Sequence, residues 1–329
     1  MLLVPMPRGH RLSGLSVADV FSADLYTGNG STQTITTGIN LSANSGLVWL
    51  KSRSNTTQHA VLTTTTGAAN SFALSGGGGL GSYVDGVTAF TSSGFSLGAD
   101  TNTADFRFNG NGYTFVSWTF CKAAKFFDVV TYTGNGVAGR TIAHALGQAP
   151  GMVITKKKED SSSWQVYHRS VGATGRLRLD LANGTGTTIT AWNNTEPTDA
   201  VFTVHSSADN NENATTYIAL LFAHDPTGVI QCGSYTGNGS ATGPTVTLGW
   251  QPQFLMIKRT DTTGGWLIYD SARSTSNPRI KKLLANSTAA EDTADEDVDF
   301  NATSFQLKST DAGINASDGN YIYMAIKAE

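Results

Sequence analysis

Charge is scarce in this sequence. Charged residues make up 14% of its 329 residues, against about 25% in average soluble proteins, and the formal net charge is −3. The longest basic run is Lys156-Lys157-Lys158. Because binding to nucleic-acid phosphates needs a broad basic surface, we do not expect a nucleic acid as partner. Thr, Ser, Asn and 36 glycines replace charge, which is typical of β-rich proteins that work outside cells, virion parts among them.

Cysteine and long apolar runs are also scarce. The two cysteines, Cys121 and Cys232, give neither a disulfide framework nor the ligand spacing of a metal site, so we expect two buried thiols, no metal and no cofactor. No run approaches the roughly 20 apolar residues of a membrane-spanning helix, so we expect no membrane insertion. Residues 1–8 lack the basic lead and apolar core of a signal peptide, so we do not expect ordinary secretion.

The usual arrangements of catalytic residues are missing too. There is no Gly-x-Ser-x-Gly, no phosphate-binding loop and no His-Glu-x-x-His, and the six histidines show no zinc-ligand spacing. Enzymes that cleave polysaccharides need two carboxylates at a working separation, and no such pair stands out. We therefore expect a protein that is not an enzyme, with a polysaccharide depolymerase as the weaker alternative.

What the sequence does contain is a five-residue motif, Tyr-Thr-Gly-Asn-Gly, that occurs three times. Its tyrosines are 106 and then 103 residues apart. Solenoid repeats are much shorter, at roughly 20 to 50 residues, whereas about 100 residues is an ordinary domain size. The motif therefore predicts repeated domains. Its defining residues are Tyr26, Asn29, Gly30, Tyr132, Asn135, Gly136, Tyr235, Asn238 and Gly239.

Other landmarks keep step with the motif. An apolar run that ends in lysine follows each motif tyrosine by 23 to 25 residues, an aromatic or imidazole ring stands eight residues after each lysine, and a last apolar run starts with tyrosine. We expect the lysines to be solvated ends of strands. The landmarks are Lys51, Lys156 and Lys258, then His59, Trp164 and Trp266, then Tyr113, Tyr217 and Tyr321.

Each repeat contains several short runs of β-branched and aromatic residues separated by Gly, Asn, Ser and Asp, which predicts antiparallel strands. The fold class is therefore all-β, with three tandem antiparallel β-sandwich domains of jelly-roll or lectin-like type, in which the first and last strands pair in one sheet. Short linkers favour stacked domains. The predicted boundaries are an N-terminal arm at 1–24 and sandwiches at 25–124, 125–226 and 227–329.

The Asn-Gly pair suggests a role for the motif. Both residues tolerate positive φ, which a two-residue hairpin turn of the primed type requires, so we expect a hairpin at one end of each sandwich. The alternative is that the three motif loops project from one rim and bind a ligand.

Candidate ligand-binding residues lie where the repeats differ. Trp192 stands in a polar stretch of repeat 2 and is expected to be exposed, while Tyr167, His168 and Arg169 form a patch suited to a sugar or a carboxylate. The third repeat has Tyr269-Asp270-Ser271 at the corresponding place, which argues against a shared catalytic role. The acidic run 291–299 is expected to be a solvated loop, with a calcium site as the alternative.

With the repeats aligned, several stretches resemble repeat-containing virion proteins of tailed bacteriophages, especially those of marine and aquatic bacteria. The resemblance runs from about residue 16 to the end of the chain. The stretches are Val17–Leu25 running into the first motif, Ser117–Phe120, Lys125–Val130 and Gly147–Ile154.

The resemblance implies a structural protein without catalytic residues, often described as tail-fibre-like or lectin-like. It is expected in the virion, made in the host cytoplasm and released by lysis, with other virion proteins and host-surface carbohydrate as partners. Exposed phage proteins usually form symmetric homo-oligomers, often trimers. The most favoured function is a tail or fibre-like appendage that contacts host glycans, and the alternative is a capsid decoration or adaptor protein.

Overall fold

The computed structural model describes residues 14–101, 107–187, 191–294 and 297–329. It is an all-β structure of antiparallel sheets, with 43% strand and 4% helix, as the strand pattern predicts. Three short helical turns, η1, α1 and α2, interrupt the sheets at Val17–Asp19, Ala208–Asn211 and Ala312–Asn315. We call β1–β9 repeat 1, β10–β16 repeat 2 and β17–β24 repeat 3; the division into three domains stays a prediction.

Each repeat contributes one large sheet, in which its first and last strands pair, as predicted. In repeat 1 the order is β1 (Phe21–Thr27), β9 (Thr114–Cys121), β3 (Gly46–Ser52), β4 (Ala60–Thr63), β5 (Asn70–Ala73) and β6 (Leu80–Ser82). In repeat 2 it is β10 (Phe127–Thr133), β16 (Thr216–Ala223), β12 (Pro150–Lys157), β13 (Gln165–His168) and β14 (Leu177–Arg178). In repeat 3 it is β17 (Ile230–Thr236), β24 (Asn320–Lys327), β19 (Pro252–Arg259), β20 (Trp266–Asp270) and β21 (Leu283–Leu284).

Each repeat also contributes a small sheet. The strands are β2 (Gln33–Thr36), β8 (Gly94–Leu97) and β7 (Val87–Thr91) in repeat 1, β11 (Arg140–Ala143) and β15 (Val201–Val204) in repeat 2, and β18 (Thr245–Thr247), β23 (Ser304–Leu307) and β22 (Val298–Asn301) in repeat 3. Since β1 already begins at Phe21, residues 21–24 belong to the first sheet and not to the predicted arm.

The central strands of the large sheets, such as β3, β9, β12, β16 and β19, are largely buried on both faces. In β19, Leu255 and Ile257 pack against the small sheet of repeat 3, whereas Phe254 and Met256 point the other way, into a core shared by all three repeats. The small sheets have a solvated outer face, so that β2 buries only Ile35, as expected for antiparallel sheets with one face in water. The large sheets therefore form the inner layer and the small sheets the outer layer.

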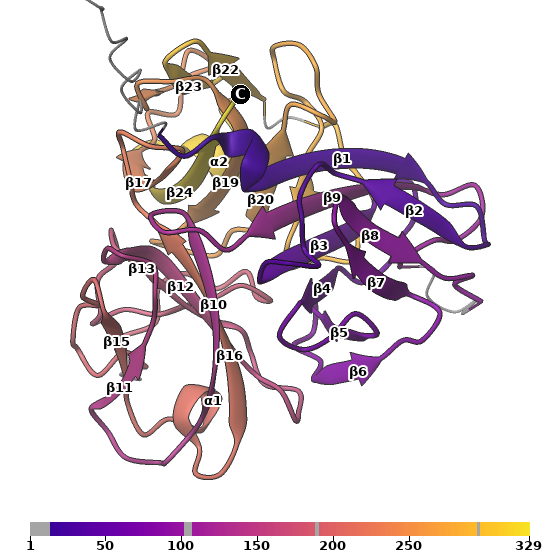
Figure 1. Cartoon of the computed structure of the whole chain (residues 1–329). Helices are drawn as coiled ribbons and strands as arrows, with labels where there is room; N and C mark the ends of the chain where they lie inside the picture. Colours follow the sequence, from indigo (N-terminus) through magenta and orange to yellow (C-terminus); the bar gives the residue numbers. More distant parts are fainter. Residues whose placement is uncertain (1–13, 102–106, 188–190, 295–296) are drawn as a thin grey trace, which may run out of the picture.

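The three repeats surround one apolar centre (Figure 1), with repeat 1 in indigo and purple, repeat 2 in magenta and pink, and repeat 3 in orange and yellow. Rings from all three meet there: the ring centroid of Phe120 lies 5.5 Å from that of Phe222 and 6.4 Å from that of Phe254. Each repeat contacts both of the others. Repeats 1 and 3, the most distant in sequence, therefore touch directly.

Backbone hydrogen bonds fasten the three contacts in the same way. In each one, the carbonyl of the residue two positions after an aligned lysine accepts from a backbone N–H of another repeat over 2.8 Å. The three pairs are Glu291 N–H to Arg53 O, Leu80 N–H to Lys158 O, and Thr185 N–H to Thr260 O. The repeats thus close on one another with approximate threefold symmetry.

The aligned lysines are buried, so the expectation of solvated strand ends is wrong. Lys51, Lys156 and Lys258 each have an exposed fraction of 0%. The Nζ of Lys51 donates to the carbonyl of Thr288 in repeat 3, and the Nζ of Lys258 to the carbonyl of Ala182 in repeat 2, both over 3.1 Å. Burial lowers the pKa of Lys156 and of Lys258 to about 8. Loops of the neighbouring repeat cover two of these strand ends, which sequence spacing does not show.

The rings that follow the lysines lie between repeats as well. The Nε2 of His59 lies 3.0 Å from the carbonyl oxygen of Leu284 in repeat 3, and the Nε1 of Trp266 donates to the carbonyl of Arg178 in repeat 2 over 2.8 Å.

Both cysteines are buried and unpaired, as predicted.

The five-residue motif connects a large sheet to a small sheet, so the predicted hairpin is wrong. In repeat 1 the motif lies between β1 and β2, but β1 pairs with β9 and β2 with β8. A primed turn on Asn29-Gly30 needs positive φ at its first residue, whereas only Gly30 has it, at +64°. The corresponding Gly136 and Gly239 have φ of +68° and +65°. The motif is therefore a corner between sheets.

A buried asparagine, which the sequence reasoning missed, fastens each corner from inside. Its Oδ1 accepts a hydrogen bond from the backbone N–H of the motif asparagine over 2.8 to 3.1 Å; the pairs are Asn29 with Asn109, Asn135 with Asn211, and Asn238 with Asn315. A Cβ on the first motif glycine, Gly28, would lie 2.2 Å from a backbone oxygen. Helices α1 and α2, which carry two of these asparagines, lie far apart in Figure 1. The motif loops do not share a rim.

One repeat landmark is shifted by two residues. The motif tyrosine of repeat 1 pairs and stacks with Phe115, not with Tyr113. The stacked pairs have centroid distances of 4.9 to 5.1 Å and are Tyr26 with Phe115, Tyr132 with Tyr217, and Tyr235 with Tyr321.

Candidate functional site

A cavity of about 440 Å³ opens on repeat 2, and we call it the repeat-2 pocket. Four chain segments meet there: the start of β12, the end of β13, the loop before β15 and the residue after β16. The lining residues are Gln148, Ala149, Pro150, Tyr167, Arg169, Glu196, Pro197 and His224. Two of the four residues that the sequence predicts as ligand contacts, Tyr167 and Arg169, are among them.

The alternation of β13 separates His168 from this pocket. Its Nε2 lies 3.1 Å from the backbone oxygen of Tyr323 in repeat 3, and its Nδ1 accepts from the N–H of Ser170. Burial lowers the pKa of His168 to about 4, so the ring is neutral at pH 7. The histidine has an exposed fraction of 1% and fastens two repeats together, so it does not contact a ligand in this pocket.

Trp192 is buried, and the expectation of an exposed ring is wrong. Its exposed fraction is 1%, and it packs edge-on against Tyr167 at a centroid distance of 6.0 Å. Asn193 and Asn194 follow with φ of 54° and 50°, a conformation that asparagine tolerates. These asparagines turn the chain so that the polar residues stay outside and the indole points inward. Trp192 therefore supports the ring of Tyr167 from behind.

The hydroxyl of Tyr167 is held by Glu196. It donates to Oε2 over 2.5 Å, while the backbone N–H of Ala173 donates to Oε1 over 2.7 Å. Burial, and then the hydrogen bond to Glu196, raise the pKa of Tyr167 well above its ordinary value. A nucleophile needs a lowered pKa or a base that takes its proton. This tyrosine stays protonated and serves as a hydrogen-bond donor and an apolar wall.

Arg169 and His224 form the basic side of the pocket. The Nη1 of Arg169 lies 3.0 Å from the Nε2 of His224. Burial, and then the charge of Arg169, lower the pKa of His224, so the imidazole is neutral at pH 7, and its Nδ1 accepts from the backbone N–H of Cys232 over 3.3 Å. Among the described residues, no carboxylate forms an ion pair with Arg169.

The basic residue of the pocket, Arg169, occurs in one repeat only, whereas Tyr167 recurs as Tyr269 in repeat 3. Arg169 corresponds to Thr64 and Ser271, because each of the three N–H groups donates to the same carbonyl position of the neighbouring strand over 2.9 to 3.0 Å. The sequence reasoning missed Gln148, Glu196 and His224, which come from separate loops and carry no repeat signal. Only the alignment of the repeats could have pointed to this site, because Arg169 is a charged residue where the other two repeats have Thr64 and Ser271.

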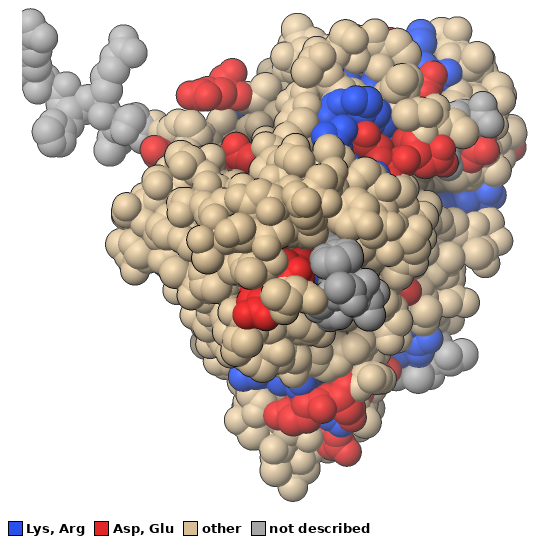
Figure 2. Space-filling model, turned by 90° about the vertical axis from the view of Figure 1, so that its right-hand side faces the viewer, with Lys and Arg blue, Asp and Glu red and all other residues tan. Residues whose placement is uncertain are grey.

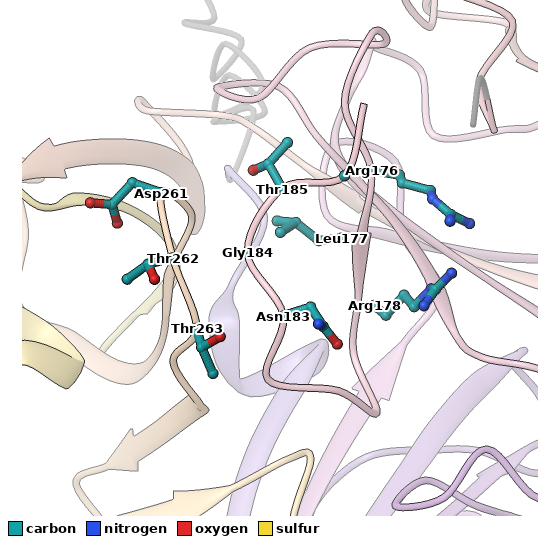
Figure 3. Close-up of a pocket in the computed structure, with 10 residues that line it drawn as sticks. Arg176, Leu177, Arg178, Asn183, Gly184, Thr185, Asp261, Thr262 and Thr263 are labelled. Carbon is teal, nitrogen blue, oxygen red and sulfur yellow. The ribbon is translucent and has the colours of Figure 1, made fainter. Parts of the chain in front are cut away.

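A second cavity, of about 410 Å³, lies between repeats 2 and 3. Figure 3 shows the loop around Gly184 beside the loop of Asp261 and Thr263, while Arg176 and Arg178 extend away from those loops. Its polar side chains do not converge, so it is the weaker candidate.

The sequence gives the acidic run 291–299 as an alternative calcium site. Across residues 14–101, 107–187, 191–294 and 297–329, no group of three or more His, Cys, Asp or Glu side chains is placed to hold a metal ion. In the acidic run, Glu291 pairs with Arg53 and Asp292 with Lys282, while Asp295 and Glu296 lie outside the described residues.

Among the residues that the structure describes, no helix is long and apolar enough to span a membrane.

The fold defines an all-β protein of repeated antiparallel sheets, and the repeat-2 pocket is its strongest candidate site. The chain belongs to the family described as a domain of unknown function, DUF7483, whose model matches residues 16–329. A search of curated proteins found no sequence that matches it.

Proposed function

We propose that the protein is a structural component of a bacteriophage virion, a tail or fibre-like appendage that contacts host-surface glycans through the repeat-2 pocket. The observation that carries this proposal is the pocket itself, since it interrupts the approximate symmetry of the three repeats with polar side chains that the other two lack. Repeats that serve only to build the body would not need this difference. The resemblance to virion proteins of tailed bacteriophages supplies the setting.

The surface supports the same proposal. On the face in Figure 2, most of the surface is neither acidic nor basic, and acidic and basic groups gather in a few clusters. With 14% charged residues, the protein offers hydroxyl, amide and backbone groups, which suit contact with polysaccharides and with other virion proteins. Repeats that close on one another form a rigid support for a binding site.

The pocket favours binding over catalysis. Tyr167 is protonated and bonded to Glu196, and His224 is bonded to Arg169, so neither group is poised as a nucleophile or a general base for a bound substrate. We propose a non-enzymatic role, with other virion proteins and host carbohydrate as partners and the virion as location.

Adsorption measurements test the proposal. The purified protein, presented at high valency on beads, should bind host cells and their envelope polysaccharide, and virions that lack it should adsorb more slowly. Electron microscopy should place it on the host-facing part of the tail. A position on the capsid shell with unchanged adsorption would instead establish the alternative, a decoration or adaptor protein. Release of reducing ends from host glycan would establish a depolymerase.

A further inference from the structure

The repeat-2 pocket holds a cation and an anion that do not pair with each other. Arg169 and Glu196 both line it, yet the ion pairs among the described residues do not include one between them. In a cavity of about 440 Å³, two opposite charges left apart can each meet a different part of one ligand. The volume falls in the range of small-molecule sites, about 300 to 1,000 Å³.

One edge of the Arg169 guanidinium is open. Its Nη1 is turned to His224 and to the carbonyl of Cys232, whereas Nε and Nη2 have no hydrogen-bond partner in the described part of the chain. The Nε–Nη2 edge fits a carboxylate with two parallel hydrogen bonds. This protein uses that same edge elsewhere, where Arg53 holds Glu291 through Nε and Nη2 over 2.9 Å each.

Two other lining residues, Glu196 and Gln148, offer acceptors and a donor for hydroxyl groups. Each oxygen of Glu196 accepts one hydrogen bond from the protein, and a carboxylate oxygen can accept a second. The Nε2 of Gln148 is buried and has no partner within the described residues. Pro150, Pro197 and the Tyr167 ring supply apolar walls, as the faces of a sugar ring require.

We infer that the repeat-2 pocket binds a carboxylate-bearing sugar residue of an acidic polysaccharide, with Arg169 on the carboxylate and Glu196 and Gln148 on the hydroxyl groups. This inference rests on the proposed function and names its ligand. A carboxylate carries one negative charge, which one guanidinium balances, and Glu196 would oppose a doubly charged phosphate in the same space. Neutral sugars would leave the open guanidinium edge without a partner.

Ligand-observed NMR and isothermal titration with glucuronate and glucose test the inference on the full chain. We expect glucuronate to bind and glucose to bind at least about tenfold more weakly, because charge-assisted hydrogen bonds are lost. Arg169→Ser, which installs the residue that repeat 3 carries at this position, should weaken glucuronate binding by a similar factor. Arg178→Ser removes the same charge from the same repeat outside the pocket and should leave binding unchanged.

Circular dichroism and urea unfolding of both variants show whether they fold like the wild type. Arg169→Lys provides a second, milder change, which keeps the charge but loses the two parallel hydrogen bonds of the guanidinium. Glucose binding as tightly as glucuronate, or an Arg169→Ser variant with wild-type affinity, would overturn the inference. If the protein adsorbs to host cells but glucuronate does not compete, the ligand class is wrong and the proposed function stands. If virions lack the protein while glucuronate still binds through Arg169, the proposed function is wrong and the ligand class stands.

Discussion

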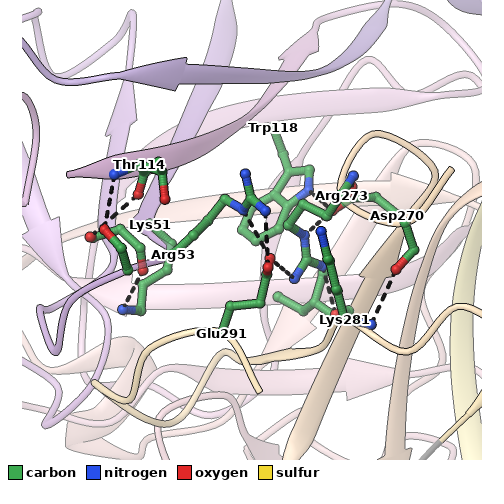
Figure 4. Close-up of polar contacts among 12 residues, drawn as sticks. Lys51, Arg53, Thr114, Trp118, Asp270, Arg273, Lys281 and Glu291 are labelled. Carbon is green, nitrogen blue, oxygen red and sulfur yellow. Dashed lines mark hydrogen bonds and ion pairs between the residues drawn. The ribbon is translucent and has the colours of Figure 1, made fainter. Parts of the chain in front are cut away.

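The contact between repeats 3 and 1 differs from the contact between repeats 1 and 2, although the same backbone hydrogen bond occurs in both. In the first, charged side chains cross from one repeat to the other (Figure 4): Arg53 of repeat 1 holds Glu291 of repeat 3 through two hydrogen bonds of 2.9 Å. In the second, Trp164 of repeat 2 packs edge-on against Phe72 of repeat 1 at a centroid distance of 5.3 Å.

The contact between repeats 3 and 1 continues into a buried polar network. The Nε1 of Trp118 in repeat 1 donates to Asp270 of repeat 3 over 3.0 Å, and Asp270 forms an ion pair of 2.6 Å with Arg273. Both side chains of this ion pair have an exposed fraction of 0%. At the 1–2 contact, by contrast, the Nε1 of Trp164, whose counterpart in repeat 1 is His59, has no partner among the described residues.

The chain connects the repeats differently at these two contacts. Repeats 1 and 2 share a short linker, which keeps their surfaces at a high effective concentration. Repeats 3 and 1 have no such linker, because all of repeat 2 lies between them in sequence. The contact that closes the structure therefore depends more on its own side chains. Directional polar groups also fix the register of this contact, whereas apolar packing alone tolerates slippage.

The largest expected effect comes from the buried ion pair. Asp270→Asn keeps the shape of the side chain but leaves the buried Arg273 guanidinium with only its longer ion pair, of 3.5 Å to Glu291, which we expect to cost about 3 to 4 kcal/mol of the free energy of unfolding. Urea unfolding monitored by tryptophan fluorescence measures it. The matched control is Asp261→Asn, which removes a half-exposed partner of Arg259 and should cost less than about 1 kcal/mol. Equal losses in both variants would show that the network does not strengthen the closing contact.

The buried lysines predict a dependence on pH. The folded-state pKa of Lys258 is about 8, below the ordinary 10.5. Between these values the unfolded chain still holds a proton that the folded protein has released, so this lysine makes stability rise with pH. The free energy of unfolding of the wild type minus that of Lys258→Met should therefore rise between pH 8 and 10.5, by on the order of 2 kcal/mol.

Below pH 7 both states of Lys258 are protonated, so the same difference should stay flat there and provides an internal control. Taking the difference removes the contribution of tyrosines with raised pKa values, which act in the opposite direction. A difference that stays flat up to pH 10.5 would contradict the lowered pKa.

The ion pair across the closing contact predicts a smaller effect. Arg53 and Glu291 are largely buried, with side-chain exposed fractions of 15% and 11%. Glu291→Gln should lower the free energy of unfolding by about 1 to 2 kcal/mol. Glu212→Gln is the control, because Glu212 pairs with Lys157 inside repeat 2 and is 47% exposed, where a loss below about 0.5 kcal/mol is expected. Glu212→Gln costing as much as Glu291→Gln would remove the distinction between closing and local ion pairs.

Much of this fold could be predicted from sequence, because the spacing of residues reflects the strands and turns within each repeat. The 100-residue period, the strand runs and the pairing of first with last strands follow from alternation and from turn residues. Residue spacing does not reveal which residues lie in contacts between repeats or between sheets. Lys51 looks like a solvated strand end until the loop at Thr288 covers it, and the Asn-Gly pair looks like a hairpin until its two flanking strands join different sheets.

The candidate site was predictable only in part, for the same reason. Tyr167 and Arg169 are adjacent to the predicted strand end, and Arg169 differs from its counterparts, Thr64 and Ser271, in the other repeats. Glu196 and His224 approach them only through loop folding. Trp192 was misplaced because neighbouring polar residues suggested exposure, whereas the left-handed turn at Asn193 and Asn194 sends the ring inward.

The smallest expected effect comes from two tryptophans that occupy corresponding positions in two of the contacts between repeats. Trp266 and Trp164 occupy corresponding positions, but only the Nε1 of Trp266 makes an interrepeat hydrogen bond, to the carbonyl of Arg178. Replacing either with phenylalanine removes a similar volume of buried ring. Trp266→Phe also removes this hydrogen bond and leaves the Arg178 carbonyl with only the 3.3 Å bond from the N–H of Leu181, so it should cost about 1 kcal/mol more than Trp164→Phe in urea unfolding. Equal costs would mean that the ring alone matters at both contacts, and a larger cost for Trp164→Phe would show that its indole nitrogen does have a partner in solution.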